Sequence, residues 1–159
     1  MNINREAIEI LKKILEAQNQ LYKKEIEIVN EKIEAVKDDD IEYLIDKTEE
    51  EKELIAKIEK LEENRIKVIE KLESDNLRAL AEKLDDIELK NKLLNLRQEL
   101  LEKINEVKNL NDILKELITI TNGVIDITVR ELTGFKEVGY KDDKKKSKVT
   151  SGNLLNRKG

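Results

Sequence analysis

Carboxylates are the reactive side chains that this sequence holds in quantity, with 36 Asp and Glu among 159 residues and neither His nor Cys. Without thiols or imidazoles, the chain cannot form a disulfide, a Cys or His zinc site, or a Ser/His or Cys/His catalytic pair. Carboxylate-bridged di-iron sites in helical bundles usually take a His as well. We therefore expect no catalytic residue, no metal site and no cofactor.

The densest group of carboxylates, Asp38-Asp39-Asp40, has the position of a helix cap rather than of an acid–base pair. No glycine-rich loop accompanies it, because the first glycine of the chain is Gly123. Asp oxygens accept hydrogen bonds from the free N–H groups at the start of a helix, and their charge is favourable there. The run predicts that one helix ends and another begins here, in a protein that is not an enzyme.

The elements that carry these carboxylates are predicted to be long helices. Charged residues make up 42% of the chain, against about 25% in an average domain. Ala, Glu, Lys, Leu and Arg together supply about half of all residues, which is typical of long helices and coiled coils. Pro is absent and all five Gly lie from Gly123 onward, so most of the chain lacks the strong helix breakers. A β-rich fold is nearly excluded.

Cap residues and apolar spacing divide the chain into helices. Asn76 opens a short segment, and Asp85 with Glu88 three residues later resembles a capping box at the start of a long helix. Gly134 is the expected C-cap, because glycine enters the left-handed conformation without steric cost. The predicted helices cover about residues 5–37, 40–73, 76–84 and 86–133.

The apolar side of each predicted helix indicates how the helices pack. In the first helix an apolar pair recurs every seven residues, and Gln18 and Glu25 interrupt the stripe, which suits packing against another helix. The stripe from Leu93 to Leu132 is wide and needs more than one partner. We predict an all-α fold, an elongated antiparallel three- to four-helix bundle or coiled coil over residues 1–134.

The first two helices are expected to fold back on each other as a hairpin. Leu15 and Tyr22 on one helix and Ile55 and Ile58 on the other are predicted core positions. Arg65 is polar on an otherwise apolar side of the second helix. It is expected either to bond a carboxylate or to lie along the surface with its apolar stem, and both are structural roles.

The end of the chain differs in charge from the rest. Residues 136–159 carry eight Lys or Arg and three acidic residues, a net charge of +5, which leaves −10 for the remainder. The Lys-rich run at 144–148 contains no aromatic residue, as is typical of a solvated segment rather than a nucleic-acid site. We predict a flexible basic tail over residues 135–159 and no nucleic-acid partner.

The sequence contains neither a predicted membrane-spanning helix nor a predicted signal peptide. No stretch approaches the ~18 uninterrupted apolar residues of a membrane helix. The N-terminus, Met1 to Glu6, lacks the basic and apolar regions of a signal peptide. We therefore expect a cytoplasmic protein without stable membrane insertion.

The long helix predicted at 86–133 exceeds its partners in length. At about 1.5 Å per residue it spans roughly 65–70 Å, against about 50 Å for each of the first two helices, so a turn or two should overhang with apolar residues uncovered. The overhang leaves three interpretations open: a docking face for an external helix, a kinked helix that repacks on itself, or a seam between two copies. Exposed apolar stripes on charged proteins usually mark interaction sites. The predicted protein-binding anchors are Leu110, Leu114, Leu117, Ile118, Val124 and Ile125.

Short motifs follow one another along the front half of the chain. They are Leu21-Tyr22, Asp39-Asp40-Ile41 with Leu44, Glu51-Lys52-Glu53-Leu54-Ile55, and Leu61-Glu62 followed by Arg65. In this order they resemble the FlgN family of flagellar export chaperones, over about residues 8–73. Two further elements, in the tail, resemble that family's Tyr-Gly element and short basic finish. These are Gly139-Tyr140, with Lys141 where the family has Gly, and Leu155-Asn156-Arg157-Lys158.

The resemblance implies a function that the residue patterns alone do not name. Members of the family are cytoplasmic chaperones of the type III export system that builds the bacterial flagellum. They bind the disordered terminal helical segments of hook-associated (hook-filament junction) proteins with their C-terminal helical region, and deliver them to the export gate. Their tail tyrosine contacts the cytoplasmic domain of the gate, a role that would fall on Tyr140 here.

Two functions from other classes remain open. A structural or scaffolding coiled-coil protein would use the same stripes in a permanent homo-oligomer, whereas an export chaperone is expected as a monomer or weak homo-oligomer. A prefoldin-like general holdase would bind any unfolded chain at the ends of paired helices. Specific one-to-one binding of a single export substrate distinguishes the chaperone from both.

Overall fold

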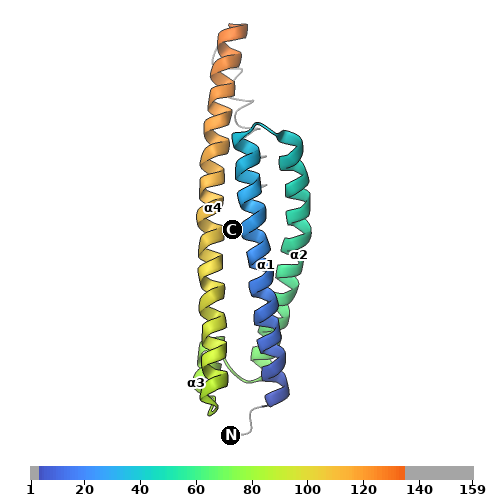
Figure 1. The fold of residues 1–159 in the computed structure, drawn as a ribbon, viewed down its shortest axis with the longest axis vertical. Helices are drawn as coiled ribbons and strands as arrows, with labels where there is room; N and C mark the ends of the chain where they lie inside the picture. The colour runs from blue at the N-terminus through green and yellow to red at the C-terminus, as the bar shows by residue number, and fades with distance from the viewer. Residues whose placement is uncertain (1–3, 135–159) are drawn as a thin grey trace.

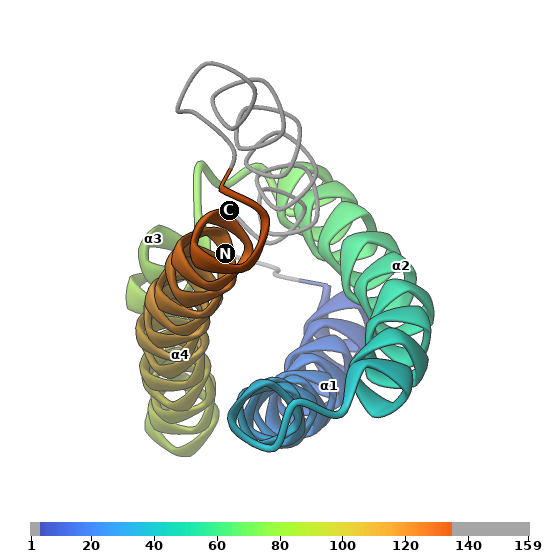
Figure 2. The same cartoon turned by 90° about the horizontal axis from the view of Figure 1, so that it is seen from above.

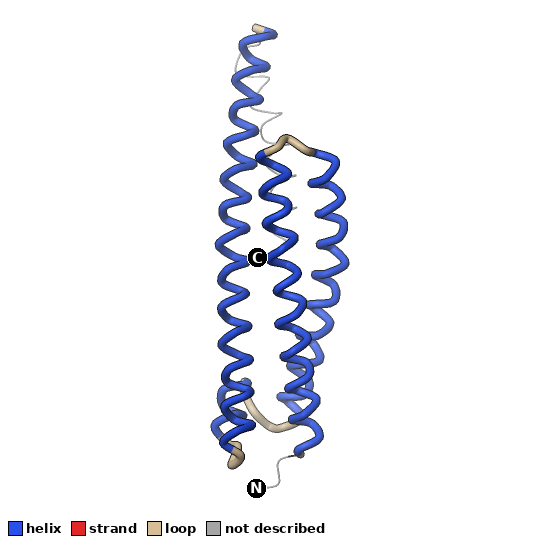
Figure 3. The backbone as a smooth tube through the Cα atoms, in the orientation of Figure 1, coloured by secondary structure: helices blue, strands red, loops and turns tan. Residues whose placement is uncertain are grey.

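The computed structural model describes residues 4–134, which form four helices (Figure 1). The helices are α1 (Arg5–Lys37), α2 (Ile41–Lys71), α3 (Leu77–Glu82) and α4 (Ile87–Thr133). Within this part of the chain there is no strand (Figure 3), and the predicted all-α helical bundle is confirmed. The tail predicted at 135–159 lies outside the described residues.

Each helix begins at a side chain that accepts a hydrogen bond from the backbone N–H group three residues later, at 2.8–3.2 Å. The four capping residues are Asn4, Asp40, Asn76 and Asp86. The cap of α4 is thus one residue later than the expected Asp85. As predicted, α4 ends at Gly134, whose φ of 66° lies in the left-handed region.

The three long helices run up, down and up, with α1 between the other two. α1 packs along both α2 and α4, whereas α2 and α4 have few contacts with each other. Seen from above, α2 and α4 lie on either side of α1 (Figure 2). α1 and α4 start at the same end of the bundle, where Arg5 Nη2 lies 3.8 Å from Asp86 Oδ2. The short α3 packs against the beginning of α4.

Two clusters of buried apolar side chains hold α1 in place. The larger joins all four helices near the beginning of α1 and consists of Ile8, Leu11, Leu15, Ile69, Leu77, Leu80, Leu93, Leu96 and Leu100. The smaller lies near the end of α1, where Val29 and Ile33 pack against Leu114 of α4. Because fully burying such a side chain contributes roughly 1.5–3 kcal/mol, the bundle is held most firmly at the end that includes α3.

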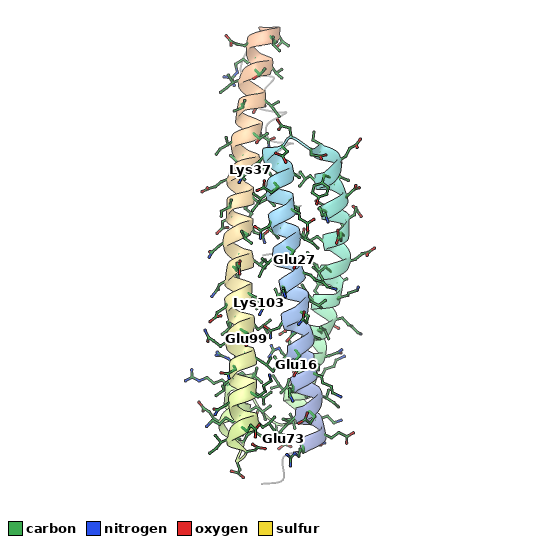
Figure 4. All side chains as sticks on the ribbon, in the orientation of Figure 1. Glu16, Glu27, Lys37, Glu73, Glu99 and Lys103 are labelled. Carbon is green, nitrogen blue, oxygen red and sulfur yellow. The ribbon has the colours of Figure 1, made fainter. Side chains whose placement is uncertain are left out.

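Along the stretch of α1 that lies between the two clusters, hydrogen bonds join α1 to α4. Asn19 donates from Nδ2 to the carbonyl oxygen of Leu96 at 3.2 Å, and its Oδ1 accepts from Lys103 Nζ at 3.0 Å. Figure 4 labels Lys103 on α4, beside α1. These bonds satisfy the buried amide and fix the relative height of the two parallel helices.

The bundle interior is more polar than the sequence predicts. Gln18 and Glu25, expected to interrupt the apolar stripe, are buried at 1% and 2% exposure. Gln18 Nε2 donates to Glu62 Oε2 at 2.7 Å, and Arg65 Nε donates to the same oxygen at 2.9 Å. Burial raises the pKa of Glu62, but the hydrogen bonds from Arg65 and Gln18 outweigh burial and lower the pKa overall. Arg65 therefore bonds a carboxylate, one of its two expected roles.

α2 turns its expected side inward, but the most buried residues in its first half are not the expected ones. Leu54 is buried, whereas the expected core residues Ile55 and Ile58 are only half-buried. Three residues before Leu54, Glu51 is 3% exposed and its Oε1 lies 3.0 Å from Nζ of the buried Lys32. Glu51 thus shares one face of α2 with Leu54 and Ile55, which follow it by three and four residues.

Candidate protein-binding face on α4

α4 extends well beyond the turn that joins α1 to α2 (Figure 1). It has 47 residues, against 33 in α1 and 31 in α2. Ile118 still packs against the smaller core cluster, whereas residues 127–133 are all exposed. Residues 119–133 span about 22 Å, or four turns. The overhang is longer than the expected one or two turns because α4 begins level with α1.

The six predicted anchors fall into three groups along α4. Leu114 is fully buried between α1 and α4 and belongs to the core of the free protein. The half-buried Leu110, Leu117 and Ile118 pack against the same cluster. Val124 and Ile125 lie on the overhang and are 58% and 53% exposed. The structure thus brings the first four residues together at the end of α1 and leaves the last two open to a partner.

Further apolar residues of the overhang were not among the predicted anchors. Ile120, Ile127 and Leu132 are 63%, 62% and 81% exposed, and Val129 is 40% exposed. Ile120 and Ile127 continue from the exposed Ile113 at intervals of seven residues. This heptad spacing was the signal available in the sequence, and it marks a second apolar side of α4.

The overhang is also poor in charge. Between Leu117 and Val129 the only charged residue is Asp126, in a chain that is 42% charged. The hydroxyl groups of Thr119 and Thr128 donate to backbone carbonyl oxygens one turn earlier, at 2.9 and 2.8 Å. These hydroxyls therefore already have partners, and the surface offers mainly methyl groups. An exposed apolar surface of this kind typically binds another protein.

A hollow lies where the overhang leaves the rest of the bundle. Its volume is about 190 Å³, and residues from all three long helices and from the α1–α2 turn line it. The lining residues are Ala35, Val36, Asp39, Asp40, Ile41, Leu44, Ile118, Thr121, Asn122 and Ile125. Most of them are apolar, and two of the predicted anchors are among them.

Polar contacts fix the start of α2 beside this hollow. The Tyr43 hydroxyl donates to Glu31 Oε2 at 2.7 Å, and Lys47 Nζ lies 5.4 Å from the centre of the Tyr43 ring. Hydrogen bonds from Lys47 and then from Tyr43 lower the pKa of Glu31, so this carboxylate is ionised at neutral pH. The group holds the first turn of α2 against α1 and thereby positions Ile41 and Leu44 as one wall of the hollow.

The described residues form neither a metal site nor a membrane-spanning helix. Residues 4–134 contain no cluster of three or more carboxylates placed to hold a metal ion. None of the four described helices is both long and apolar enough to cross a membrane. Tyr140, the predicted contact for an export gate, lies outside the described residues.

The fold and the exposed face define a class, an elongated helical bundle whose longest helix exposes an apolar side beyond its partners. Residues 1–148 match the family model described as FlgN protein, and the chain therefore belongs to the FlgN family. No curated protein and no solved structure matches the chain. Membership identifies it, in general terms, as a flagellar export chaperone that binds flagellar proteins. The family is not known for enzymatic activity.

Proposed function

We propose that this chain binds the disordered terminal helical segment of hook-associated proteins and delivers it to the flagellar export gate. In this proposal the chaperone acts in the cytoplasm as a monomer or weak homo-oligomer. Residues 1–134 are the binding module, and the basic tail at 135–159 makes contact with the gate. The observation that carries the proposal is the apolar overhang of α4, which α1 and α2 leave uncovered.

The chemistry of the overhang suits a partner that folds as it binds. A disordered amphipathic segment can form a helix with its apolar side on α4, as in other helix-in-groove complexes. Coupled folding of this kind buries on the order of 1,000–3,000 Å² and costs roughly 2–5 kcal/mol in ordering the segment. Binding therefore remains reversible, as a protein that releases its cargo requires.

A calorimetric titration tests the proposal against its two alternatives. The probes are the N- and C-terminal segments of each hook-associated protein encoded in the same genome, with reduced, unfolded lysozyme as an unrelated chain. Saturable one-to-one binding of one terminal segment supports the chaperone. Binding of the unfolded lysozyme with equal affinity supports a general holdase, and a permanent oligomer in light scattering with no peptide binding supports a scaffold.

Val124→Asp should weaken binding of that segment at least tenfold, a loss of about 1.4 kcal/mol. Val124 is 58% exposed in the free protein, so the change should leave the fold intact while burying a carboxylate in the complex. Calorimetry measures the affinity, and circular dichroism checks the fold. Ile87→Asp is the matched control, because Ile87 is 71% exposed at the opposite end of α4. Equal affinities for the two variants would exclude Val124 from the site.

Tyr140→Ala should weaken binding to the cytoplasmic domain of the export gate and leave substrate affinity unchanged. Tyr combines a large contact area with a hydroxyl group at a low entropic cost, which suits a docking anchor. Surface plasmon resonance with the immobilised gate domain measures the first quantity, and the titration above measures the second. Tyr140→Phe is the control, since it keeps the ring. Wild-type gate affinity in the Ala variant would remove Tyr140 from the proposed site.

A further inference from the structure

The side of α4 that packs on α1 continues without a break into the overhang. Its positions follow one another three or four residues apart and are Val107, Asn111, Leu114, Ile118, Thr121, Ile125, Thr128 and Leu132. α1 ends at Lys37, and exposure along this side rises from 0% at Leu114 to 53% at Ile125 and 81% at Leu132. The overhang therefore presents the same kind of surface that α1 covers along the earlier part of α4. Because α1 has already ended, this part of the surface is left uncovered.

The hollow described above lies at this point. Its apolar wall combines Val36 at the end of α1, Ile41 and Leu44 at the start of α2, and Ile118 and Ile125 on α4. Its volume is about 190 Å³, and an apolar cavity of ~150 Å³ accommodates a molecule as large as benzene. The hollow can therefore receive one leucine or phenylalanine side chain of a partner.

The charges around the hollow distinguish the two ends of a partner helix. Asp38, Asp39 and Asp40 are all exposed in the turn between α1 and α2, and Asp39 and Asp40 line the hollow. The C-terminal end of α1 and the N-terminal end of α2 meet in this turn, so their opposite partial charges largely cancel and the negative charge is that of the aspartates. The N-terminal end of a helix carries roughly +0.5 elementary charge and the C-terminal end roughly −0.5. This corner of the molecule therefore attracts a helix N-terminus and repels a helix C-terminus.

We infer that the hollow receives the N-terminal end of an amphipathic partner helix that lies on α4 in line with α1 and runs parallel to α4. One large apolar side chain in its first turn enters the hollow, and a Lys or Arg beside it faces Asp38 and Asp39. Later apolar residues of the helix cover Ile125 and Leu132. The inference rests on the proposed function, and it adds the direction of the bound segment and a second wall, formed by α2.

The apolar wall is tested by Ile41→Asp, with the terminal segment that binds the wild-type chain as the probe. Ile41 is 68% exposed and is the first residue of α2, where a carboxylate favours the helix. Affinity should fall about tenfold or more, as expected for an anchor residue. Ile45→Asp is the matched control, because Ile45 is 56% exposed one turn later and does not line the hollow. Equal affinities for the two variants would overturn the inference.

The charge contribution is tested by the paired change Asp38→Asn and Asp39→Asn. Asn tolerates the left-handed φ of 53° at Asp39, so the turn should keep its conformation. Affinity for the same segment should fall about two- to fivefold in dilute buffer, and the difference should disappear in ~1 M salt, where the Debye length is only about 3 Å. A variant that binds as tightly as the wild type in dilute buffer would contradict the assigned partner chemistry.

The direction of the helix is tested by disulfide formation, because the chain has no cysteine of its own. Asn122→Cys should cross-link to a cysteine at the N-terminal end of the bound segment, and Thr133→Cys to one at its C-terminal end. The reverse pattern would overturn the parallel orientation. Cross-links between two copies of the Asn122→Cys chain that persist with the segment present would show instead that a second copy occupies the face.

Failure of the proposed function and failure of the inference about the hollow give different results. If the wild-type chain binds no terminal segment of a hook-associated protein, the proposed function fails. If it binds one, and Ile41→Asp and Ile45→Asp bind that segment equally, the proposed function stands and only the role of the hollow is lost.

Discussion

Leu15→Ala should lower the free energy of unfolding by about 2–5 kcal/mol, the usual cost of removing a fully buried leucine side chain. Leu15 is 0% exposed and belongs to the larger apolar cluster, to which all four helices contribute. A cavity there would remove contacts from several helices at once. The cost should lie high in this range, because neighbours held by four helices cannot easily collapse into the space.

Urea denaturation followed by circular dichroism measures this loss, provided that the slope of the transition is unchanged. Ile10→Ala is the matched control, because Ile10 lies on the same helix but is 48% exposed. Its substitution should cost well under half as much. If the two variants unfold at the same urea concentration, the larger cluster is not the centre of stability.

The helices could be predicted from the sequence because their ends and apolar spacing are local properties. Asp40 starts α2 by accepting a hydrogen bond from a backbone N–H group three residues later, and Gly134 ends α4 through its own left-handed backbone conformation. Both signals involve only near neighbours in the sequence. The apolar residues of α1 recur every seven positions over the whole helix, and Leu15 is buried as expected. Signals of this kind do not depend on the partner helix.

The depth of burial along α2 could not be predicted in the same way. Leu54 and Ile55 are adjacent and equally apolar, so the spacing alone does not decide which of the two is more deeply buried. The same side of α2 also buries Glu51, which pairs with Lys32 on another helix. Gln18 is likewise buried because Glu62 supplies a hydrogen-bond partner. From the sequence alone, a polar residue within an apolar stripe is interpreted as exposed. Only the structure shows the hydrogen-bond partner that allows it to be buried.

The sequence predicts which part of α4 carries the candidate site, but not which of its side chains are exposed there. The difference in helix length indicates an overhang, yet only the relative height of α1 and α4 decides which residues it includes. That height places Leu114 in the core and Val124 in solvent. The hollow could not be anticipated, because it combines Ile41 of α2 with Ile125 of α4, which are far apart in the sequence.

Lys32→Met should lower the free energy of unfolding by about 3–5 kcal/mol, because it leaves a buried carboxylate without its cation. Lys32 and Glu51 are 2% and 3% exposed, and their charged groups are 3.0 Å apart. Burial lowers the pKa of Lys32, and the negative charge of Glu25 acts in the opposite direction. The ammonium group is thus costly to bury alone and depends on nearby carboxylates.

The double change Lys32→Met and Glu51→Leu should recover most of that loss, since apolar residues can replace a buried ion pair at little or no cost. Urea denaturation of the wild type, both single variants and the double variant gives the coupling energy of the pair. The double variant should remain folded, because the two introduced apolar side chains can pack between α1 and α2 where the ion pair lay. If the double variant is as unstable as Lys32→Met, the pair stabilises the fold itself. If Lys32→Met unfolds at the same urea concentration as the wild type, Glu51 does not depend on Lys32 in the folded protein.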